Sequence, residues 1–345
     1  MKLQQLIENH WYNRINLWLT FILLPLSILF SIVSRIRYLL YKFKIFKSNK
    51  LPVPLIVVGN ITVGGVGKTP LTKYLAKELS TKGIKVGVIL RGYKSKIKYP
   101  HIVSPTDTSE MVGDEALIYV QNNIKVAISK KRYLAALELL KNFPDIELII
   151  SDDGLQHYSL ISDYKIAVID ATRMFGNKFL LPMGPLRENI NSLGNVDAIV
   201  INGDLSPQEN FLHTIKLINP KITISQQNLI IDKIFNPITK EIVNINMINN
   251  FNTIAIAAIG NPNRFFDFLI KYGIKLNGKI AFPDHYNFKI NDIPKEYDAI
   301  LVTEKDYVKL AKFSNDKIWV ILIKVELDNQ DIIRQIKNLK DKSHG

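Results

Sequence analysis

A run of glycines that ends in a lysine and a threonine lies at residues 62–69. It consists of Thr62, Val63, Gly64, Gly65, Val66, Gly67, Lys68 and Thr69. Glycines let successive backbone N–H groups turn toward one anion, and a helix that starts there adds the positive end of its dipole. In such a loop the lysine reaches the β- and γ-phosphates of a nucleotide, and the threonine hydroxyl binds Mg²⁺. The run therefore predicts a nucleoside-triphosphate site, although Thr62 stands where the usual pattern has a glycine.

A pair of carboxylates that could complete this site follows a second apolar segment. Residues 148–151 are Leu, Ile, Ile and Ser, and Asp152 and Asp153 come directly after them. A carboxylate at the end of a buried strand is suited to hold Mg²⁺ beside bound phosphates. Two aspartates can also simply open a turn. Because the glycine-rich run lies upstream, we interpret Asp152 as a Mg²⁺ ligand.

An acidic pair at a predicted helix start could supply a base. Asp114 and Glu115 follow Gly113, and a carboxylate in the first turn is favoured by the helix dipole. A base in reach of an attacking hydroxyl assists phosphoryl transfer. An aspartate that only caps the helix fits the same position equally well, so the residues alone leave both roles open.

The elements that must position these residues alternate between strand and helix. Short apolar runs predict strands at residues 55–58, 86–90, 146–151, 166–170, 198–201, 253–259, 299–303 and 319–323. Helical patterns fall at residues 69–80, 114–121, 131–141, 264–271 and 330–339. This alternation predicts an α/β protein: a P-loop NTPase-like domain with a mostly parallel sheet, and a smaller α/β domain.

A break in the alternation suggests where the domains divide. Residues 229–235 and 241–243 are strand-like and flank Asn236-Pro237, which predicts a hairpin or two-stranded connector. We therefore predict an N-terminal membrane-associated helical segment at residues 1–48 and a P-loop core domain at 49–228. The connector occupies 229–245, and the smaller C-terminal α/β domain occupies 246–345.

The N-terminal segment carries an apolar run with basic flanks. Residues 15–34 contain no charged side chain, and Glu8 and Glu78 enclose a stretch without any acidic residue. About 20 helical residues can span the roughly 30 Å hydrocarbon core, yet Pro25 and several Ser residues interrupt the run. Apolar residues at positions 36, 39, 40 and 43 alternate with Arg and Lys, which is typical of a helix in the membrane interface. We expect an inserted or interfacial anchor, with a true span and a buried core helix as alternatives.

The overall composition limits the possible partners. The net charge is +14 and there is no cysteine, so disulfides and thiolate metal sites are excluded. A basic surplus attracts nucleic acid, anionic lipid or phosphorylated substrates. The aromatic and basic interleaving of a nucleic-acid-reading module is missing, so we expect no nucleic-acid partner.

Seven short motifs follow one another along the chain. In chain order they are the glycine-rich run with Pro70, Arg91-Gly92-Tyr93, Gly113-Asp114-Glu115, residues 152–157 (Asp-Asp-Gly-Leu-Gln-His), residues 181–188 (Leu-Pro-Met-Gly-Pro-Leu-Arg-Glu), residues 282–285 (Phe-Pro-Asp-His) and residues 303–306 (Thr-Glu-Lys-Asp). Together and in this order they resemble the tetraacyldisaccharide 4′-kinase family of lipid A biosynthesis. The resemblance covers the chain from the apolar segment to about residue 312.

The resemblance implies a reaction and a location. The γ-phosphoryl group of ATP would pass to the 4′-hydroxyl of a tetraacylated glucosamine disaccharide 1-phosphate, with Mg²⁺ as cofactor and lipid IVA as product. The enzyme would be a monomer bound to the membrane surface, at the cytoplasmic face of the inner membrane. Its active site would lie in the cleft between the two domains, with the apolar N-terminal segment near the mouth.

The resemblance also assigns roles to individual residues. Asp114 is implied as the catalytic base, His285 as the group that orients it, and Lys68 as the phosphate-binding cation. Thr69, Glu115 and Asp152 are implied as Mg²⁺ ligands. The implied substrate contacts, which are weaker, are Asp153, His157, Arg132, Arg187 and Glu188. Glu304, Lys305 and Asp306 are expected to be structural ties within the second domain.

The main alternative is a membrane-associated P-loop NTPase switch. Such proteins often carry an additional lysine at the start of the glycine-rich run, where this chain has Val63. A GTPase would need Asn-Lys-x-Asp for guanine, and residues 303–306 do not match that order. These departures favour the kinase.

Overall fold

The computed structural model describes residues 3–204, 209–313 and 315–343. The strands are β1 (Leu55–Gly59), β2 (Val86–Leu90), β3 (His101–Ile102), β4 (Lys125–Ile128), β5 (Leu148–Asp152), β6 (Tyr164–Asp170), β7 (Ala198–Asn202), β8 (Thr223–Phe235), β9 (Ile242–Val243), β10 (Thr253–Ala257), β11 (Gly278–Ala281), β12 (Ala299–Thr303) and β13 (Ile318–Leu327). The α-helices are α1 (Leu3–Tyr12), α2 (Leu17–Lys42), α3 (Lys68–Thr81), α4 (Ser109–Val112), α5 (Asp114–Gln121), α6 (Arg132–Asn142), α7 (Glu209–Ile218), α8 (Ile245–Ile248), α9 (Pro262–Lys271), α10 (Glu304–Leu310) and α11 (Asp331–Ser343). Short 3₁₀ helices are η1 (Ile190–Asn195), η2 (Ile290–Asp292) and η3 (Ala311–Phe313).

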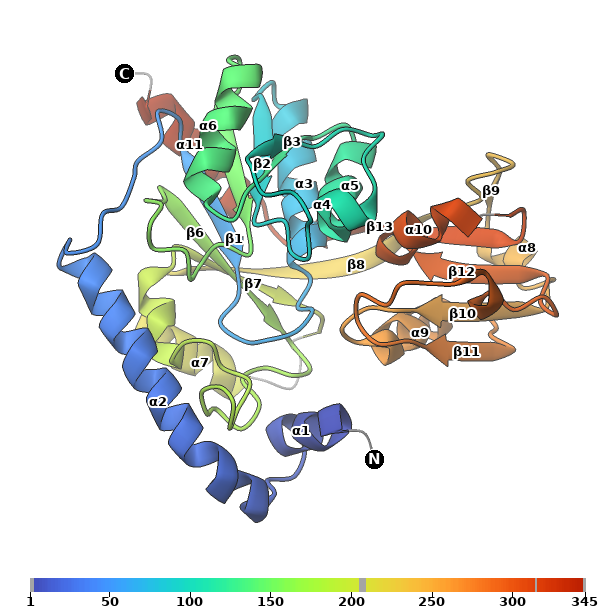
Figure 1. The fold of residues 1–345 in the computed structure, drawn as a ribbon, viewed down its shortest axis with the longest axis horizontal. Helices are drawn as coiled ribbons and strands as arrows, with labels where there is room; N and C mark the ends of the chain where they lie inside the picture. Colours follow the sequence, from blue (N-terminus) through green and yellow to red (C-terminus); the bar gives the residue numbers. More distant parts are fainter. Residues whose placement is uncertain (1–2, 205–208, 314, 344–345) are drawn as a thin grey trace.

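All of these strands belong to one continuous sheet. Its order is β11-β10-β12-β13-β8-β7-β6-β1-β5-β2-β4-β3, and β9 pairs with β8. The pairs from β8 through β7, β6, β1, β5 and β2 to β4 are parallel. The predicted α/β class with a mostly parallel, P-loop NTPase-like sheet is confirmed, and Figure 1 shows helices on both sides of it.

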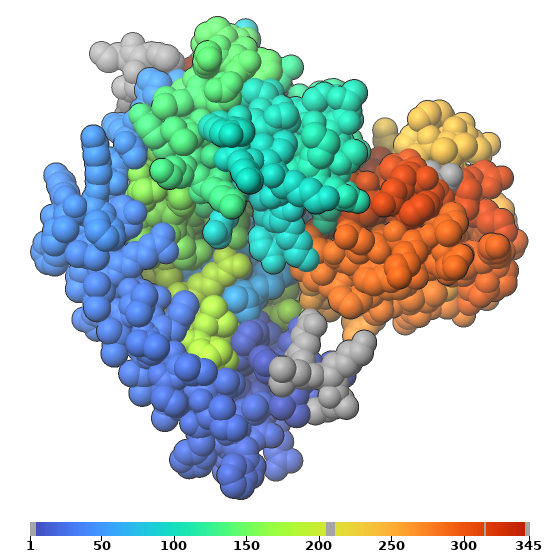
Figure 2. All heavy atoms as spheres, in the orientation of Figure 1, coloured from blue at the N-terminus to red at the C-terminus, as the bar shows by residue number. Residues whose placement is uncertain are grey.

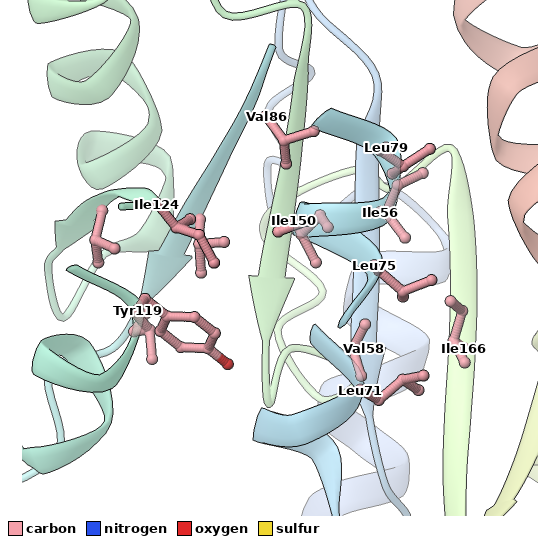
Figure 3. Close-up of a cluster of buried hydrophobic side chains, with 14 of the residues drawn as sticks. Ile56, Val58, Leu71, Leu75, Leu79, Val86, Tyr119, Ile124, Ile150 and Ile166 are labelled. Atoms are coloured by element: carbon pink, nitrogen blue, oxygen red, sulfur yellow. The ribbon is translucent and has the colours of Figure 1, made fainter. Parts of the chain in front are cut away.

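The first half of the fold contains β1 to β7, and its central strands β1, β2, β5 and β7 are buried along their whole length. Alternate residues of a strand point to opposite sides, so both faces of these strands are covered. Ile56 and Val58 of β1 belong to the hydrophobic cluster beneath α3, whereas Leu55 and Val57 belong to the cluster beneath α6. Figure 3 shows the α3 side of this core, with Leu71, Leu75 and Leu79 packed over the sheet. This two-sided burial fixes α3, and with it the loop that precedes α3.

The second half of the fold contains β9 to β12 and has its own hydrophobic core. The long strands β8 and β13 connect it to the first half. β8 pairs in parallel with β7 at its beginning and antiparallel with β13 over its remaining length. β8 also pairs antiparallel with β9 around Asn236, as in a hairpin. However, the two strands that cross between the halves are β8 and β13, because β13 is long enough to pair along β8 (Figure 1). The predicted domain limits remain a prediction.

The last helix does not stay with the second half. Ile332, Ile333 and Ile336 of α11 are buried in the hydrophobic cluster that also contains β1 and α3. α11 is amphipathic, and its apolar face packs on the core of the first half because β13 ends beside that core. By its packing, α11 therefore extends the first core, although its residues lie in the range assigned to the smaller domain.

The apolar N-terminal segment forms α2, which lies on the outside of the molecule. Trp18 is 80% and Phe21 is 75% exposed, and only 6% of the most apolar stretch of α2 is buried. Pro25 lies inside α2 without ending the helix. Figure 2 shows α2, in blue, along an outer edge. By length and composition α2 could cross a membrane, and it is not a buried core helix.

Candidate active site

The glycine-rich run lies between β1 and α3 and is supported from below by two amides. Gly67 has φ of 93°, which glycine adopts without strain, and it precedes the first residue of α3. Asn202 Nδ2 donates to the carbonyl of Val66 at 2.7 Å, and Gln227 Nε2 donates to that of Gly67 at 3.3 Å. Because the carbonyls are held on this side, the N–H groups of the loop are free to face an anion.

Lys68 is directed by partners on both sides of the loop. Its Nζ lies 3.1 Å from Asn60 Oδ1 and 3.3 Å from Asp153 Oδ1. Asn60 in turn donates from Nδ2 to the carbonyl of Thr62 at 2.5 Å. The ammonium is thus held over the loop by one amide and one carboxylate.

Asp152 ends β5 beside the start of α3. The Thr69 hydroxyl donates to Asp152 Oδ2 at 3.3 Å, and the buried Tyr119 hydroxyl donates to the same oxygen at 2.6 Å. Oδ1 of Asp152 is buried without a hydrogen-bond partner. Burial, and then the nearby Glu115 carboxylate, raise the pKa of Asp152 to about 6. A buried carboxylate oxygen without a partner is an arrangement that a cation would stabilise.

The described residues contain no group of three or more His, Asp or Glu side chains arranged to hold a metal. At a phosphate site Mg²⁺ usually takes one or two carboxylates and fills its other positions with phosphate oxygens and water. Thr69 and Asp152 are adjacent, and Glu115 lines the same cavity. The residues present therefore suit a Mg²⁺ that arrives with the nucleotide.

Asp153 is the centre of a group of cations. Arg187 Nη1 lies 3.1 Å from both Asp153 carboxylate oxygens, and Lys68 contacts one of them. Burial opposes ionisation of Asp153, but Lys68 and Arg187 outweigh it and hold the pKa at about 2. The Arg132 side chain donates to the backbone carbonyls of Asp152 and Asp153 at 3.0 and 2.7 Å. Arg132 therefore fixes the backbone here, and φ of Asp153 is 51°, in the left-handed region.

Asp114 and His285 meet across the two halves. Asp114 begins α5, and His285 Nδ1 lies 2.9 Å from Asp114 Oδ2. Gly113 has φ of 90°, and a Cβ there would lie 2.8 Å from the Tyr93 carbonyl oxygen, so only glycine allows this approach. His285 itself has φ of 58°, a conformation that a non-glycine residue rarely adopts and that often marks a functional position.

A cavity of about 1120 Å³ joins these groups. The residues that line it include the glycine-rich loop, Asp114, Glu115, His285, Asp152 and Asp153, together with Phe30, Val33 and Arg37 of α2. The exposed apolar helix and the phosphate loop thus border one continuous space.

The remaining predicted substrate residues lie beside α2. Glu188 accepts a hydrogen bond from the Tyr158 hydroxyl at 2.5 Å, and Arg37 lies over the Tyr158 ring at 5.7 Å. His157 Nε2 lies 3.1 Å from Ser159 Oγ. His157 and Glu188 both line the cavity, as do the other predicted site residues except Thr62 and Val63 at the start of the glycine-rich run.

Residues 19–340 match a family model described as tetraacyldisaccharide-1-P 4′-kinase. The chain belongs to this family. A curated tetraacyldisaccharide 4′-kinase from Chromobacterium violaceum is 39% identical over 331 residues and covers 94% of each chain. One from Pasteurella multocida is 40% identical over 327 residues, covering 93% of this chain and 95% of the relative. The crystal structure of LpxK from Aquifex aeolicus in complex with ATP is similar, with 30% identity, a TM-score of 0.77 and coverage of 92% and 98%.

Membership in the family establishes the activity class. This kinase is a tetraacyldisaccharide 4′-kinase of lipid A biosynthesis, as the motifs indicated. The alternative of an NTPase switch is thereby set aside.

The sequence did not reveal several residues that shape the site of this kinase. Asn202 and Gln227 support the phosphate loop from β7 and β8, and Tyr119 orients Asp152 from α5. A polar residue at the end of the otherwise apolar strand β7 is the signal that could have indicated Asn202, whereas Gln227 lies inside β8 among other polar residues and gives no such signal. Glu304, expected to tie the second domain internally, instead pairs with Lys73 of α3 at 2.5 Å, so that expectation was wrong for Glu304.

A partly buried ion pair also joins the halves of the kinase. Arg264 Nη1 lies 2.6 Å from Asp170 Oδ2, and Asp170 is only 2% exposed. We expect Arg264→Met to lower the free energy of unfolding by about 3 kcal/mol, because it leaves a buried carboxylate without its cation. Urea unfolding at pH 7 measures this. Arg334→Met, which removes an exposed partner of Asp331, is the matched control, and an equal loss in both variants would contradict the prediction.

His157 should make the stability of the kinase sensitive to acid. Burial, and then Arg132 and Arg37, lower the pKa of His157 from 6.5 to about 4. The unfolded chain takes up the proton on His157 at higher pH than the folded chain does. The stability that neutral His157 contributes is therefore present above pH 6.5 and is lost as the pH falls to about 4. We expect His157→Gln to flatten this part of the stability profile in urea unfolding at a series of pH values. The exposed His213→Gln is the control, and parallel profiles for wild type and His157→Gln would contradict the prediction.

Proposed function

We propose that this kinase transfers the γ-phosphoryl group of ATP to the 4′-hydroxyl of an acylated glucosamine disaccharide 1-phosphate, with Asp114 as the base. The single observation that carries the proposal is the shared cavity. It brings a phosphate loop, a carboxylate–histidine pair and an exposed apolar helix to one space. A reaction between a soluble nucleotide and a lipid-borne alcohol needs these three features together.

The nucleotide would bind at residues 62–69. The backbone N–H groups and the N-terminus of α3 suit phosphate oxygens, and Lys68 is positioned to reach the β- and γ-phosphates. The relative from Aquifex aeolicus was crystallised in complex with ATP, which supports the choice of nucleotide. Thr69, Asp152 and Glu115 would hold Mg²⁺, and that ion, when bound, would neutralise charge on the β- and γ-phosphates.

Asp114 would accept the proton of the attacking hydroxyl. The carboxylate lies at the start of α5 and lines the cavity, and its Oδ2 faces His285 while Oδ1 has no hydrogen bond to that ring. As the hydroxyl oxygen approaches phosphorus, its proton passes to Asp114 and the leaving group is ADP. Arg187 and Arg132 would hold Asp153 and the β5 end in place around the transferred phosphate.

The lipid would approach along α2. Acyl chains are costly to expose to water, and α2 presents Trp18, Phe21 and Ile22 to the outside while Phe30, Val33 and Arg37 line the cavity. We propose that α2 lies in the membrane interface with its basic flank on anionic headgroups. The kinase would then work as a monomer at the cytoplasmic face of the inner membrane, where ATP is available.

The test uses the purified full chain in mixed micelles with tetraacyldisaccharide 1-phosphate, ATP and Mg²⁺. The expected product is heavier than the acceptor by one phosphoryl group in mass spectrometry, and ADP appears in equal amount. ATP hydrolysis at the same rate without acceptor, and no phosphorylated lipid, would overturn the proposal.

A further inference from the structure

Two lysines from one short helix face the Asp114–His285 pair. Lys305 Nζ lies 3.4 Å from His285 Nε2, and Lys309 Nζ lies 4.0 Å from Asp114 Oδ2. Both belong to α10 and are largely buried, with side chains 18% and 3% exposed. Lys309 is paired more closely with Asp306, at 3.1 Å. Lys305 is therefore the cation that faces the histidine directly, although it was expected to be only a structural tie.

The donors and acceptors around His285 leave one consistent arrangement. A lysine ammonium can only donate, so a hydrogen bond between Lys305 and Nε2 requires Nε2 to accept. The ring proton is then on Nδ1, which donates to Asp114 Oδ2. Asp284 Oδ1 is 3.8 Å from Nε2, beyond hydrogen-bond distance, and instead accepts a hydrogen bond from Lys305 Nζ at 3.3 Å. The Tyr93 ring, 5.1 Å from His285, adds no charge.

Lys305 keeps its charge in this environment. Burial alone would lower the pKa of Lys305, but the carboxylates of Glu115, Asp284 and Asp114 outweigh it and raise the pKa. The charged Lys305 can only donate to Nε2, so this contact leaves Nδ1 as the position of the ring proton that faces Asp114.

An ion pair connects the first residue of α10 to α3, the helix that follows the phosphate loop. Glu304, the first residue of α10, pairs with Lys73 of α3 at 2.5 Å and accepts from Asn122 Nδ2 of the α5 end at 3.5 Å. Lys73 lies one helical turn beyond Thr69. Glu304, which precedes Lys305 in α10, thus binds to α3, the helix whose N-terminus would hold the nucleotide.

We propose that Lys305 is a positioning residue whose ammonium donates to His285 Nε2 and so keeps the Nδ1–H tautomer directed at Asp114. Through Glu304 and Lys73, the same helix links the base to the phosphate loop. The inference rests on the proposed role of Asp114 as base. Without Lys305, the ring is free to place its proton on Nε2 and to turn Nδ1 into an acceptor that repels the carboxylate.

The tautomer is measured first, in the unaltered kinase. In the ¹⁵N-histidine NMR spectrum, with His285 assigned by its loss in His285→Gln, we expect Nε2 to be unprotonated and Nδ1 to carry the proton. A protonated Nε2 in the wild type would overturn the proposal, and this result does not depend on the folding of any variant.

Three variants then test the consequence. We expect Lys305→Met to lower kcat on the order of tenfold, with little change in KM for ATP. This loss is smaller than that expected for removing the base itself, because Lys305 only positions the histidine that orients the base. Its His285 signals should report loss of the single tautomer. Lys305→Arg, which keeps a cationic donor, should restore both kcat and the tautomer in large part. The matched control is Lys312→Met, whose exposed ammonium lies 3.9 Å from Glu110 and away from the cavity.

The outcomes separate this inference from the proposed function. If Asp114→Asn abolishes turnover while Lys305→Met leaves kcat and the NMR spectrum unchanged, Lys305 has no positioning role and Asp114 remains the base. If Asp114→Asn leaves turnover intact, the proposed base is wrong whatever Lys305→Met does. If Lys305→Arg is as slow as Lys305→Met, donation to Nε2 is not the reason for the loss.

Discussion

Replacing Asp114 with asparagine is expected to lower kcat by about 10²- to 10⁴-fold, the usual contribution of a positioned general base. In the wild type His285 Nδ1 lies 2.9 Å from Asp114 Oδ2. Asparagine has the same shape as aspartate, and its side-chain oxygen can still accept this hydrogen bond. What it cannot do is take the proton of the sugar hydroxyl. Initial rates of phosphoryl transfer to the disaccharide lipid in mixed micelles give kcat.

The nucleotide affinity of the same variant separates chemistry from folding. We expect Asp114→Asn to bind ATP as tightly as the wild type in calorimetric titration, because the phosphate loop lies on another element. Asp331→Asn, at the exposed start of α11, controls for the change of charge. Turnover equal to that of the wild type would remove Asp114 as the base.

Replacing Gly67 with alanine should weaken nucleotide binding strongly. A Cβ at Gly67 would lie 2.2 Å from Asn202 Nδ2 and 2.7 Å from Gln227 Nε2, and φ of 93° is strained for any other residue. Left-handed strain of about 1–2 kcal/mol and the loss of a buried hydrogen bond of similar size reduce the affinity for ATP by roughly 10²-fold or more. Calorimetric titration with ATP measures the change in Kd.

A matched glycine variant shows whether the effect is local. Gly194→Ala adds a Cβ 3.6 Å from Ile218 Cγ2, which is ordinary van der Waals contact, and should bind ATP like the wild type. The circular dichroism of both variants should match, because Gly67 lies in a loop between two intact elements. An unchanged Kd for Gly67→Ala would show that the amides of Asn202 and Gln227 do not shape the phosphate loop.

The parts of the site that the sequence predicted are local ones. The phosphate loop depends on eight consecutive residues between a strand and a helix, so its chemistry and its position can be inferred from the residues themselves. Asp152 follows from the same reasoning, because it ends a strand that pairs directly with β1. The exposed α2 was also evident, since a long apolar run between basic flanks is typical of a segment that contacts lipid.

The parts that could not be predicted depend on distant contacts. Asn202 and Gln227 reach the phosphate loop only because β7 lies beside β6 and β8 lies beside β7 in the sheet, and no spacing in the sequence encodes that order. The pairing of Lys73 with Glu304 joins residues 231 positions apart. Without the seven-motif resemblance, His285 would have remained a single histidine with no assigned partner.

The two long strands that join the halves limit how the enzyme can open. β8 and β13 are hydrogen-bonded to each other across the junction, in contrast to a flexible tether. Eight residue pairs of this ladder would have to separate for the halves to come apart, whereas a small change in strand twist leaves the ladder whole. Any relative rotation of the halves would therefore act first on the side-chain pairs that bridge them, such as Arg264–Asp170 and Lys73–Glu304.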